Sequence, residues 1–238
     1  MTKALYAQIA DELRNNIQQA IYQSGDKLPT EAQLSERFGV NRHTVRNAIA
    51  ILKDEGLVRV DRGRGTFVAA TPIQYPIGKR VRYNENLKAQ GIKASYQTIK
   101  AIEIPADKAI ATALNIAIGA KVILIERLSL ADNQPISIAG SYFPSDRFPD
   151  LISHWKKHTS ISRLLKEVYS CEHLRHSTKV SARVVREADA RLLQVPLNYP
   201  ILLAESINVD ENKKVIEYGL SRFCGEKMEL VFINFLPN

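Results

Sequence analysis

The stretch 28–68 restricts the fold of this chain more than any other part of its sequence. It reads as a helix, a three-residue break, a second helix and a hairpin with a basic, glycine-rich tip. Thr30 and Gln33 have the spacing of a capping box, which predicts where the first of these helices begins. Gly39 breaks that helix, and Asn41 is a suitable N-cap for the second one. This order of elements predicts a winged helix-turn-helix, a unit that binds DNA.

The second helix of such a unit lies in the major groove, with its N-terminal residues at the base edges. Val45, Ile49 and Leu52 would form its buried side, so the opposite side would face DNA. The hairpin tip would probe the minor groove or the phosphates, because glycines allow a close approach. The predicted DNA-binding residues are Asn41, Arg42, His43, Thr44 and Arg46 of the helix, and Arg62, Gly63 and Arg64 of the tip. A solvated helical bundle with an incidental basic face is the alternative.

The sequence patterns also predict how the chain is divided into domains. An amphipathic helix precedes the DNA-binding unit, because apolar residues recur every fourth position from Leu5 to Ile21. Residues 69–79 contain two prolines and show neither a helical nor a strand period, which is typical of a linker. The expected organisation is therefore a DNA-binding domain at 1–70, a linker at 71–79 and a second domain at 80–238.

The second domain is expected to be an antiparallel α+β domain, because strands joined by tight turns alternate with short helices. The helices are expected at 84–90, 107–114, 160–169 and 187–193, and the strands at 96–104, 121–131, 136–143, 173–185, 201–209, 215–224 and 229–235. Ala-Asp at 106–107 and at 188–189 each begins a predicted helix, and a strand and a turn follow each time. This faint repeat predicts a duplicated domain with a cleft between its halves, where ligands often bind.

The net charge of the 238-residue chain is +8, from 33 Lys and Arg against 25 Asp and Glu. Residues 37–64 hold seven basic and three acidic residues, which suits a DNA-binding unit. Residues 71–100 hold six basic residues and one acidic residue, outside that unit. Arg80 and Arg82 precede Asn84, the expected cap of a helix, and a helix start beside arginines favours anions. A solvated basic strand that contacts DNA phosphates is the alternative for this stretch.

Several classes of protein are excluded by composition and motifs. The apolar content of 45% is that of an ordinary globular chain, and no apolar run is long enough to cross a membrane. Two cysteines, Cys171 and Cys224, make no disulfide framework, so a reducing cytoplasm is expected. The motifs GxSxG, HExxH and the Walker loop are absent, so we expect neither an enzyme nor a cofactor. The histidine pairs 154/158 and 173/176 are interpreted as surface residues rather than metal ligands.

Arg127 is a second candidate for an anion site. It lies in a strand of alternating apolar residues, where a charge is costly unless it is paired. Glu126 and Glu217 could be simple ion-pair partners, and the sequence leaves that possibility open beside a ligand-binding role.

The N-terminal motif resembles a known family. LPTEAQLSERFGVNRHTVRNAIAILKDEGLVRVDRGRGTFV is similar to the winged helix-turn-helix of GntR-type bacterial transcription regulators. The resemblance implies that Arg42, Thr44 and Arg46 contact an operator, together with Arg62 and Gly63 of the wing. Many relatives carry a basic residue where this chain has Ala32, so one of their DNA contacts is missing here.

The second domain also resembles part of this family. ENLKAQG, ALNIAIGAKVILIERLSLADNQPISIAGSYF and IEYGLSRF are similar to the effector (UTRA) domain of the HutC subgroup, which has a chorismate-lyase-like fold. The resemblance implies an anionic effector, and the expected binding residues are Arg80, Arg82, Asn84, Glu85, Arg127, Ser129, Ser160 and Glu217. A family arginine would fall at Ser129 and a family acid at Ala139. Their loss favours a small phosphonate or phosphate, as in regulators of phosphonate metabolism, over a sugar phosphate.

The expected protein is a homodimeric repressor that binds a palindromic operator in double-stranded DNA and responds to a small anionic effector. A regulator of the same family that responds to a sugar phosphate or an amino-acid catabolite is one alternative. A lyase-like enzyme fused to a DNA-binding domain, or an architectural DNA-binding protein with an inactive ligand domain, is another.

Overall fold

The computed structural model describes residues 4–61, 63–69, 72–80 and 83–232, with only the backbone given for residues 83 and 84. The chain divides into two compact units, Met1–Thr71 and Pro72–Asn238. Each unit has its own hydrophobic cores. Within the described ranges, no helix is both long enough and apolar enough to span a membrane.

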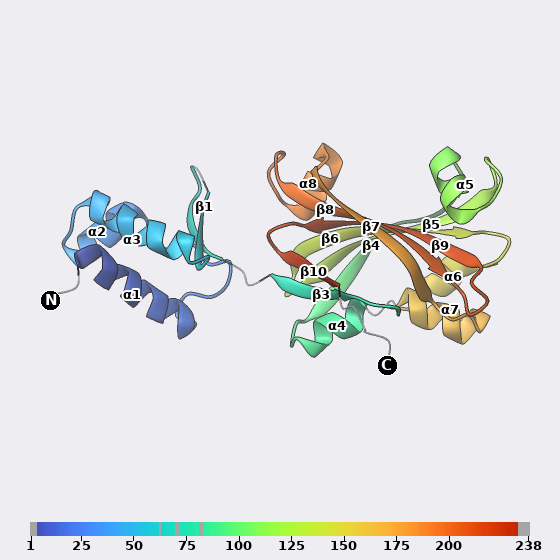
Figure 1. The fold of residues 1–238 in the computed structure, drawn as a ribbon, viewed down its shortest axis with the longest axis horizontal. Helices are drawn as coiled ribbons and strands as arrows, with labels where there is room; N and C mark the ends of the chain where they lie inside the picture. The colour runs from blue at the N-terminus through green and yellow to red at the C-terminus, as the bar shows by residue number, and fades with distance from the viewer. Residues whose placement is uncertain (1–3, 62, 70–71, 81–82, 233–238) are drawn as a thin grey trace. The chain divides into compact units, whose positions relative to one another are not determined.

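The N-terminal unit is a winged helix-turn-helix, as the sequence predicts (Figure 1). It consists of α1 (Leu5–Gln18), α2 (Glu31–Phe38), α3 (Arg42–Asp54) and a wing of two antiparallel strands, β1 (Val58–Asp61) and β2 (Gly65–Val68). Thr30 and Gln33 form the predicted capping box of α2, and Asn41 caps α3. Gly39 ends α2 with φ of 62°, a left-handed conformation that glycine adopts at little cost.

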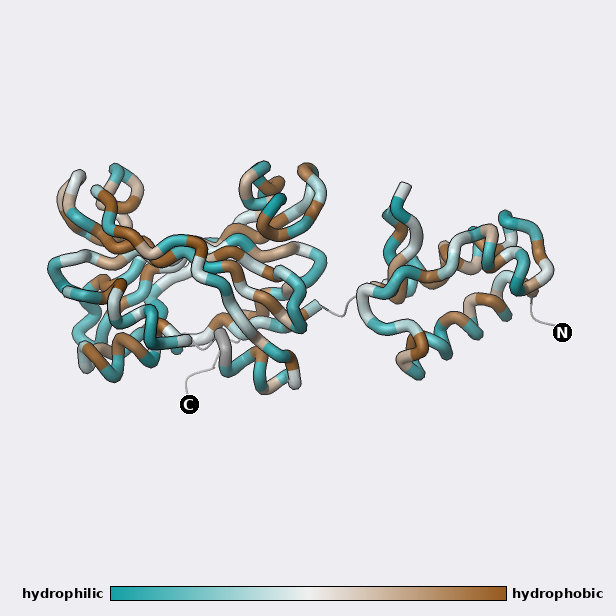
Figure 2. Tube along the Cα trace, turned by 180° about the vertical axis from the view of Figure 1, so that it is seen from behind, coloured by the Kyte–Doolittle hydropathy of each residue, from teal (hydrophilic) through white to brown (hydrophobic). Residues whose placement is uncertain are grey.

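The core of this unit lies where the three helices and the wing meet. Leu13, Leu34, Val45 and Leu52 are completely buried there, one or two from each helix. Figure 2 shows hydrophobic residues spaced at intervals along these helices, as an amphipathic pattern requires. The helix α1 ends earlier than its apolar period predicts, because Ala20 has a φ of 57° and the chain leaves the helical path before Ile21.

The C-terminal unit is built on a six-stranded antiparallel sheet with the strand order β4-β5-β6-β9-β8-β7. These strands are β4 (Ala94–Pro105), β5 (Lys121–Ala131), β6 (Gln134–Pro144), β7 (Leu174–Val184), β8 (Pro200–Val209) and β9 (Val215–Cys224). The unit is therefore the antiparallel α+β domain that the sequence predicts.

The two halves of this sheet repeat one arrangement, a strand, a helix and a hairpin. The first half is β4, α5 (Lys108–Leu114), β5 and β6, and the second is β7, α8 (Glu187–Leu193), β8 and β9. The helices α5 and α8 occupy corresponding places on one face of the sheet (Figure 1). The predicted duplication is present, but the two Ala-Asp pairs do not occupy equivalent positions in its halves. Asp107 is the N-cap of α5, whereas Asp189 lies inside α8, which is capped by Arg186.

The opposite face of the sheet is covered by α4 (Tyr83–Ala89), α6 (Leu151–Trp155), α7 (Ile161–Tyr169) and a small two-stranded parallel sheet (Figure 1). That sheet pairs β3 (Ile73–Ile77) with β10 (Met228–Phe232). The expectation of a structureless linker at 71–79 is wrong for β3. Its hydrogen-bonding partner lies about 150 residues further along the chain, so local sequence gives no sign of it. The short helix α6 was also not predicted.

Replacing Leu34 by Ala is expected to destabilise the N-terminal unit by about 2–5 kcal/mol, because it leaves a cavity in a fully packed core. Leu5, which is 60% exposed on α1, provides the matched control. The Leu5→Ala variant should unfold in urea nearly as the wild type does. Equal unfolding midpoints for the two variants would contradict this account of the core.

Candidate functional site

The N-terminal half of α3 presents a polar surface to solvent. Val45, Ile49 and Leu52 are buried on the inner side, as predicted. Asn41 Oδ1 accepts hydrogen bonds from the amide and the hydroxyl of Thr44, at 2.9 and 3.0 Å. These bonds fix the helix start, so part of the hydrogen-bonding capacity of Asn41 and Thr44 is used inside the protein. Arg42, His43 and Arg46 are exposed, on the side that the sequence predicts for DNA contact.

The two arginines of this surface differ in their surroundings. Arg46 donates from Nε to Glu31 Oε2 over 2.8 Å. Arg42 forms no side-chain hydrogen bond or ion pair with any residue that the structure describes.

The wing carries cations around one aromatic ring. The guanidinium carbon atoms of Arg59 and Arg64 lie 5.2 and 6.0 Å from the centre of the Phe67 ring, and Lys27 Nζ lies 6.0 Å from it. Gly63, with φ of 74°, provides the left-handed turn at the tip. Arg64 is exposed there, in a position suited to phosphate contact. Arg62, which was also predicted to bind DNA, lies outside the described residues.

A pocket of about 630 Å³ lies in the C-terminal unit on the face of the sheet that α4, α7 and β3 cover. Six residues predicted to bind an effector line it: Arg80, Glu85, Arg127, Ser129, Ser160 and Glu217. Arg82 lies outside the described residues, and the side chain of Asn84 is not described. The structure therefore brings together residues that are far apart in the sequence, within the cleft that the repeat predicted.

The floor of the pocket is formed by alternate residues of neighbouring strands, which point to the same face of a sheet. Arg127 of β5 lies opposite Ala139 of β6, and Ala139 lies opposite Ser221 of β9. The guanidinium carbon of Arg127 is 5.8 Å from the centre of a Trp155 ring. Serine dominates the lining, with Ser129, Ser137, Ser141, Ser160, Ser162, Ser206 and Ser221. A surface of hydroxyl donors and cations suits an oxyanion.

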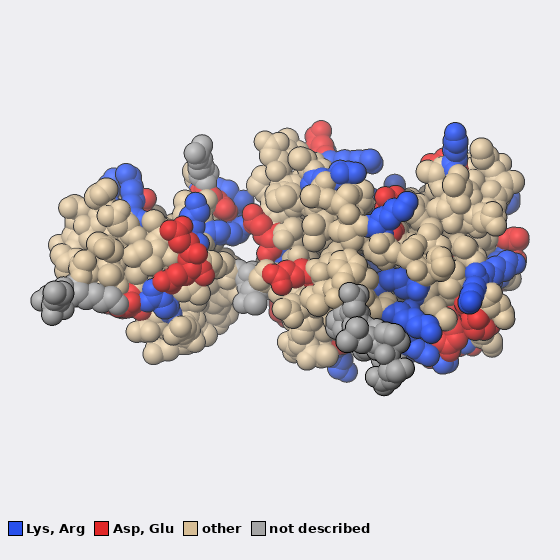
Figure 3. Space-filling view, viewed as in Figure 1, with Lys and Arg blue, Asp and Glu red and all other residues tan. Residues whose placement is uncertain are grey.

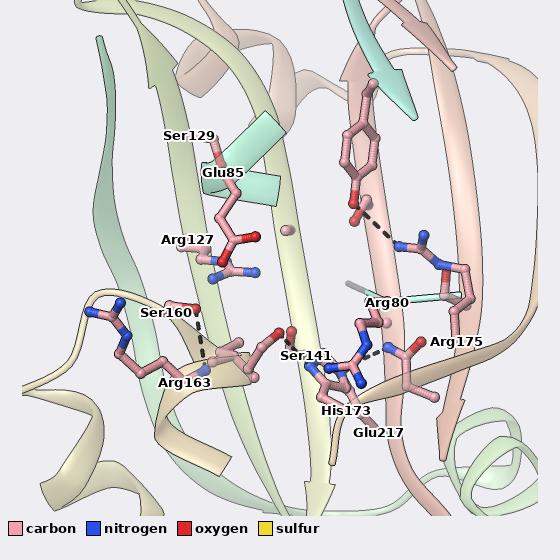
Figure 4. Close-up of a pocket in the computed structure, with 18 of the residues that line it drawn as sticks. Arg80, Glu85, Arg127, Ser129, Ser141, Ser160, Arg163, His173, Arg175 and Glu217 are labelled. Atoms are coloured by element: carbon pink, nitrogen blue, oxygen red, sulfur yellow. Dashed lines mark hydrogen bonds and ion pairs between the residues drawn. The ribbon is translucent and has the colours of Figure 1, made fainter. Parts of the chain in front are cut away.

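The first turn of α7 forms one wall of this pocket. Ser160 caps the helix and accepts a hydrogen bond from the amide of Arg163. The other amides of the first turn have no acceptor within the helix, and the helix dipole there favours negative charge. Arg127, Ser160 and Arg163 lie on one side of the pocket, and Arg80 and Arg175 lie on the other (Figure 4).

Positive charge exceeds negative charge around the pocket. Its lining includes six cations, Arg80, Lys88, Arg127, Arg163, Lys166 and Arg175, against Glu85, Glu167, Glu172 and Glu217. Figure 3 shows Lys and Arg side chains gathered near α7, beside acidic ones. Glu172 accepts from Lys166 and Arg80 over 2.9 and 3.3 Å, so part of the charge is already balanced. No sequence pattern singles out Arg163, Lys166 and Arg175, although the first two lie in the helix that Ser160 caps.

Arg175 connects the pocket to the segment that follows the DNA-binding unit. Its Nη1 donates to the carbonyl of Gly78 over 3.1 Å, and its Nη2 donates to the hydroxyl of Tyr75 over 3.3 Å. Its amide donates to the carbonyl of Lys79 over 2.7 Å. Tyr75, Ile77 and Arg80 of the same segment line the pocket. The chain that leaves the DNA-binding unit is therefore itself a wall of the pocket.

Glu217 and His173 form a buried pair at the pocket. His173 Nε2 donates to Glu217 Oε2 over 2.5 Å, and Asn208 Nδ2 donates to the same oxygen over 2.6 Å. A hydrogen bond of 2.8 Å joins His173 Nδ1 to Ser162 Oγ. Burial alone would raise the pKa of Glu217, but the charge of His173 and hydrogen bonds from His173, Ser141 and Asn208 outweigh it. Together they lower that pKa to about 2.

Two interpretations of the sequence are corrected by these contacts. His173 is 7% exposed and hydrogen-bonded on both nitrogens, so it is not a surface histidine. The two glutamates considered as ion-pair partners of Arg127 bind other residues. Glu217 bonds to His173, and Glu126 accepts from Arg222 over 2.8 Å. Among the residues that the structure describes, no three His, Cys, Asp or Glu side chains are grouped so that they could hold a metal ion.

The fold defines a winged helix-turn-helix joined to a second domain that contains a pocket. Residues 5–68 match the family of bacterial regulatory proteins called the gntR family, and residues 89–229 match the UTRA domain. The chain therefore belongs to the GntR family of bacterial transcription regulators, in the group that carries a UTRA domain.

Three similar proteins extend over nearly the whole chain. "Uncharacterized HTH-type transcriptional regulator RB1450" of Rhizobium meliloti (strain 1021) is 33% identical and covers 97% of this chain and 95% of its own length. "Probable transcriptional regulator PhnF" of Escherichia coli (strain K12) is 30% identical, with 94% and 92% covered. The crystal structure of PhnF from Mycobacterium smegmatis has a TM-score of 0.69 at 26% identity, with 98% and 100% covered. Within the family, the segments VNRHTVRNAI and TKVSARVVREADARLLQVP of this chain resemble PhnF.

The buried Glu217 is expected to make folding sensitive to acid. Because its pKa is lower in the folded protein, the ionised form stabilises the fold above its ordinary pKa near 4.5. This stabilisation is lost as the pH falls from there towards 2. The free energy of unfolding of the wild type should therefore decrease more steeply than that of Glu217→Gln between about pH 5 and pH 3. Urea unfolding at several pH values measures both slopes. The exposed Glu229 supplies the control, since Glu229→Gln should retain the wild-type slope.

Proposed function

We propose that the protein is a homodimeric repressor whose affinity for a palindromic operator is controlled by a small anionic effector in the C-terminal unit. The observation that carries the proposal is the pocket, where Arg127 faces the first turn of α7 among serines and further cations. Helix amides, hydroxyls and guanidinium groups are the donors that phosphate and phosphonate oxygens require. The protein would act in the cytoplasm, where a bacterial operator is accessible.

The effector class that we favour is a phosphonate or phosphate. Ser129 and Ala139 line the pocket at the two positions where the family resemblance implies an arginine and an acid. Two small side chains in these positions remove one charge contact and one acceptor for ligand hydroxyls. A sugar phosphate or an amino-acid catabolite is the second candidate, because 630 Å³ is also large enough for a ligand of that size.

Control of DNA binding requires that the effector binds one arrangement of the protein more tightly than another. Arg175 supports such a link, since it lines the pocket and also holds Tyr75 and Gly78. An anion that draws the guanidinium towards itself would loosen the segment that continues into the DNA-binding unit. Two copies of α3 in a symmetric dimer would then lose the spacing that two operator half-sites require.

Replacing Arg46 by Ala should weaken specific DNA binding by about 1–3 kcal/mol, because it removes a base contact from the recognition helix. Fluorescence anisotropy with an operator selected from random duplexes measures this loss. Lys53→Ala removes the same charge from the exposed far end of α3 and should have a much smaller effect. Equal losses in the two variants would exclude a base-reading role for Arg46.

Replacing Arg127 by Ala should abolish the response to the effector and leave DNA binding unchanged. Inorganic phosphate, methylphosphonate and glucose 6-phosphate are suitable probes, tested by calorimetry and by release of the operator. We expect at least one of the first two to bind the wild type, and Arg127→Ala to bind it about tenfold or more weakly. Arg183→Ala, an exposed arginine of β7 outside the pocket, should respond normally. A response to glucose 6-phosphate alone would favour the second candidate, and no response to any probe would reject the proposed effector class.

A further inference from the structure

The contact between Glu31 and Arg46 joins the two helices of the helix-turn-helix at its outer surface. Glu31 is the first residue of α2, and Arg46 is the fifth residue of α3. The bond runs from Arg46 Nε to Glu31 Oε2 over 2.8 Å. Within the described ranges, Glu31 is the one side chain that holds the guanidinium of Arg46.

This bond leaves the outer edge of the guanidinium available. A guanidinium has five N–H groups in one plane, and the bond uses the single one on Nε. The four N–H groups on Nη1 and Nη2 remain, and one from each nitrogen points outwards in parallel. Guanine presents O6 and N7 in the major groove at the spacing that such a pair of donors matches. Arg46 therefore retains the pair of parallel donors that bidentate contact with guanine requires.

The position of Glu31 is itself fixed by the fold. The capping box of Thr30 and Gln33 determines where α2 begins, and Leu34, one turn further on, is completely buried. The neighbours of Glu31 are Thr30 and Ala32, so no cation beside it in α2 competes for its carboxylate. The carboxylate thus approaches α3 from a rigid helix start.

The contact contributes little to folding. The side chains of Arg46 and Glu31 are 63% and 37% exposed, and ion pairs as exposed as this stabilise proteins only weakly. A carboxylate at a DNA-binding surface also repels phosphates, which reduces affinity for every DNA sequence. An acid that weakens general binding and orients one arginine is suited to discrimination between sequences.

We propose that Glu31 is a specificity-determining residue, which positions Arg46 so that it reads one guanine in each operator half-site. The proposal rests on the proposed function, since it requires that α3 of this chain reads an operator. Arg42 provides a contrast on the same helix, because no described residue holds its side chain. The base opposite Arg46 should therefore be selected sharply, and the base or phosphate opposite Arg42 more loosely.

The test compares Glu31→Ala with Glu36→Ala in the full-length protein. Both variants remove one negative charge from α2, but Glu36 is exposed and has no described side-chain partner. Each protein selects binding sequences from a library of random duplexes, and anisotropy then measures affinity for the selected site and for each single-base change. Thermal unfolding of the same samples reports any structural effect.

We expect both variants to bind unselected DNA more tightly than the wild type does, since both lose a negative charge. Only Glu31→Ala should lose preference for one guanine per half-site, by about tenfold. Glu31→Gln should retain part of this preference, because its amide oxygen can still accept from Nε.

The possible failures are distinguishable. The inference is wrong if Glu31→Ala selects the same guanine as sharply as Glu36→Ala, or if both lose it equally. It is also wrong if Glu31→Ala is destabilised in thermal unfolding and loses base preference equally at every position of the operator site. A wild-type protein that selects no sequence would reject the proposed function. A wild-type site whose preferences survive Arg46→Ala would reject the reading role of Arg46.

Discussion

The antiparallel pairing of β6 with β9 is the interaction on which the C-terminal unit depends. It joins two halves, each with the order strand, helix and hairpin, into one sheet. Neither half then has an unpaired edge strand at the centre of that sheet. The same pairing places Ser137, Ala139 and Ser141 of one half beside Gly219, Ser221 and Phe223 of the other. The centre of the pocket floor therefore lies where the two halves meet, and small side chains there leave room for a ligand.

Two separate features make the surroundings of this pocket positive. Acidic groups in the lining already have partners: Glu172 binds Lys166 and Arg80, Glu167 pairs with Arg163, and the buried Glu217 binds His173. Helix α7 adds the partial positive charge of its first turn without adding a titratable group. Arg80 and Lys88 of the basic stretch at 71–100 line this pocket, whose volume of about 630 Å³ is too small for a polyanion.

The DNA-binding unit depends on local signals that act at fixed positions. A capping box, a left-handed glycine and an asparagine cap determine where α2 ends and α3 begins. The buried stripe of α3 then turns its arginines outwards. These determinants act over three or four residues, so they could be read without knowledge of the fold. The N-terminal unit was accordingly predictable almost element by element, apart from the end of α1.

The sequence by itself determined the winged helix-turn-helix, the antiparallel α+β class of the second unit and the family, because capping, periodicity and motif spacing are local. Only the tertiary structure decided the contacts between distant segments. It turned part of the expected linker into β3 by pairing it with β10, buried His173 against Glu217, and recruited Arg163 and Arg175 to the pocket. It also joined Glu31 to Arg46 across two helices. Each of these contacts depends on a partner that lies at least 15 positions away or in another element, and local sequence carries no information on such pairs.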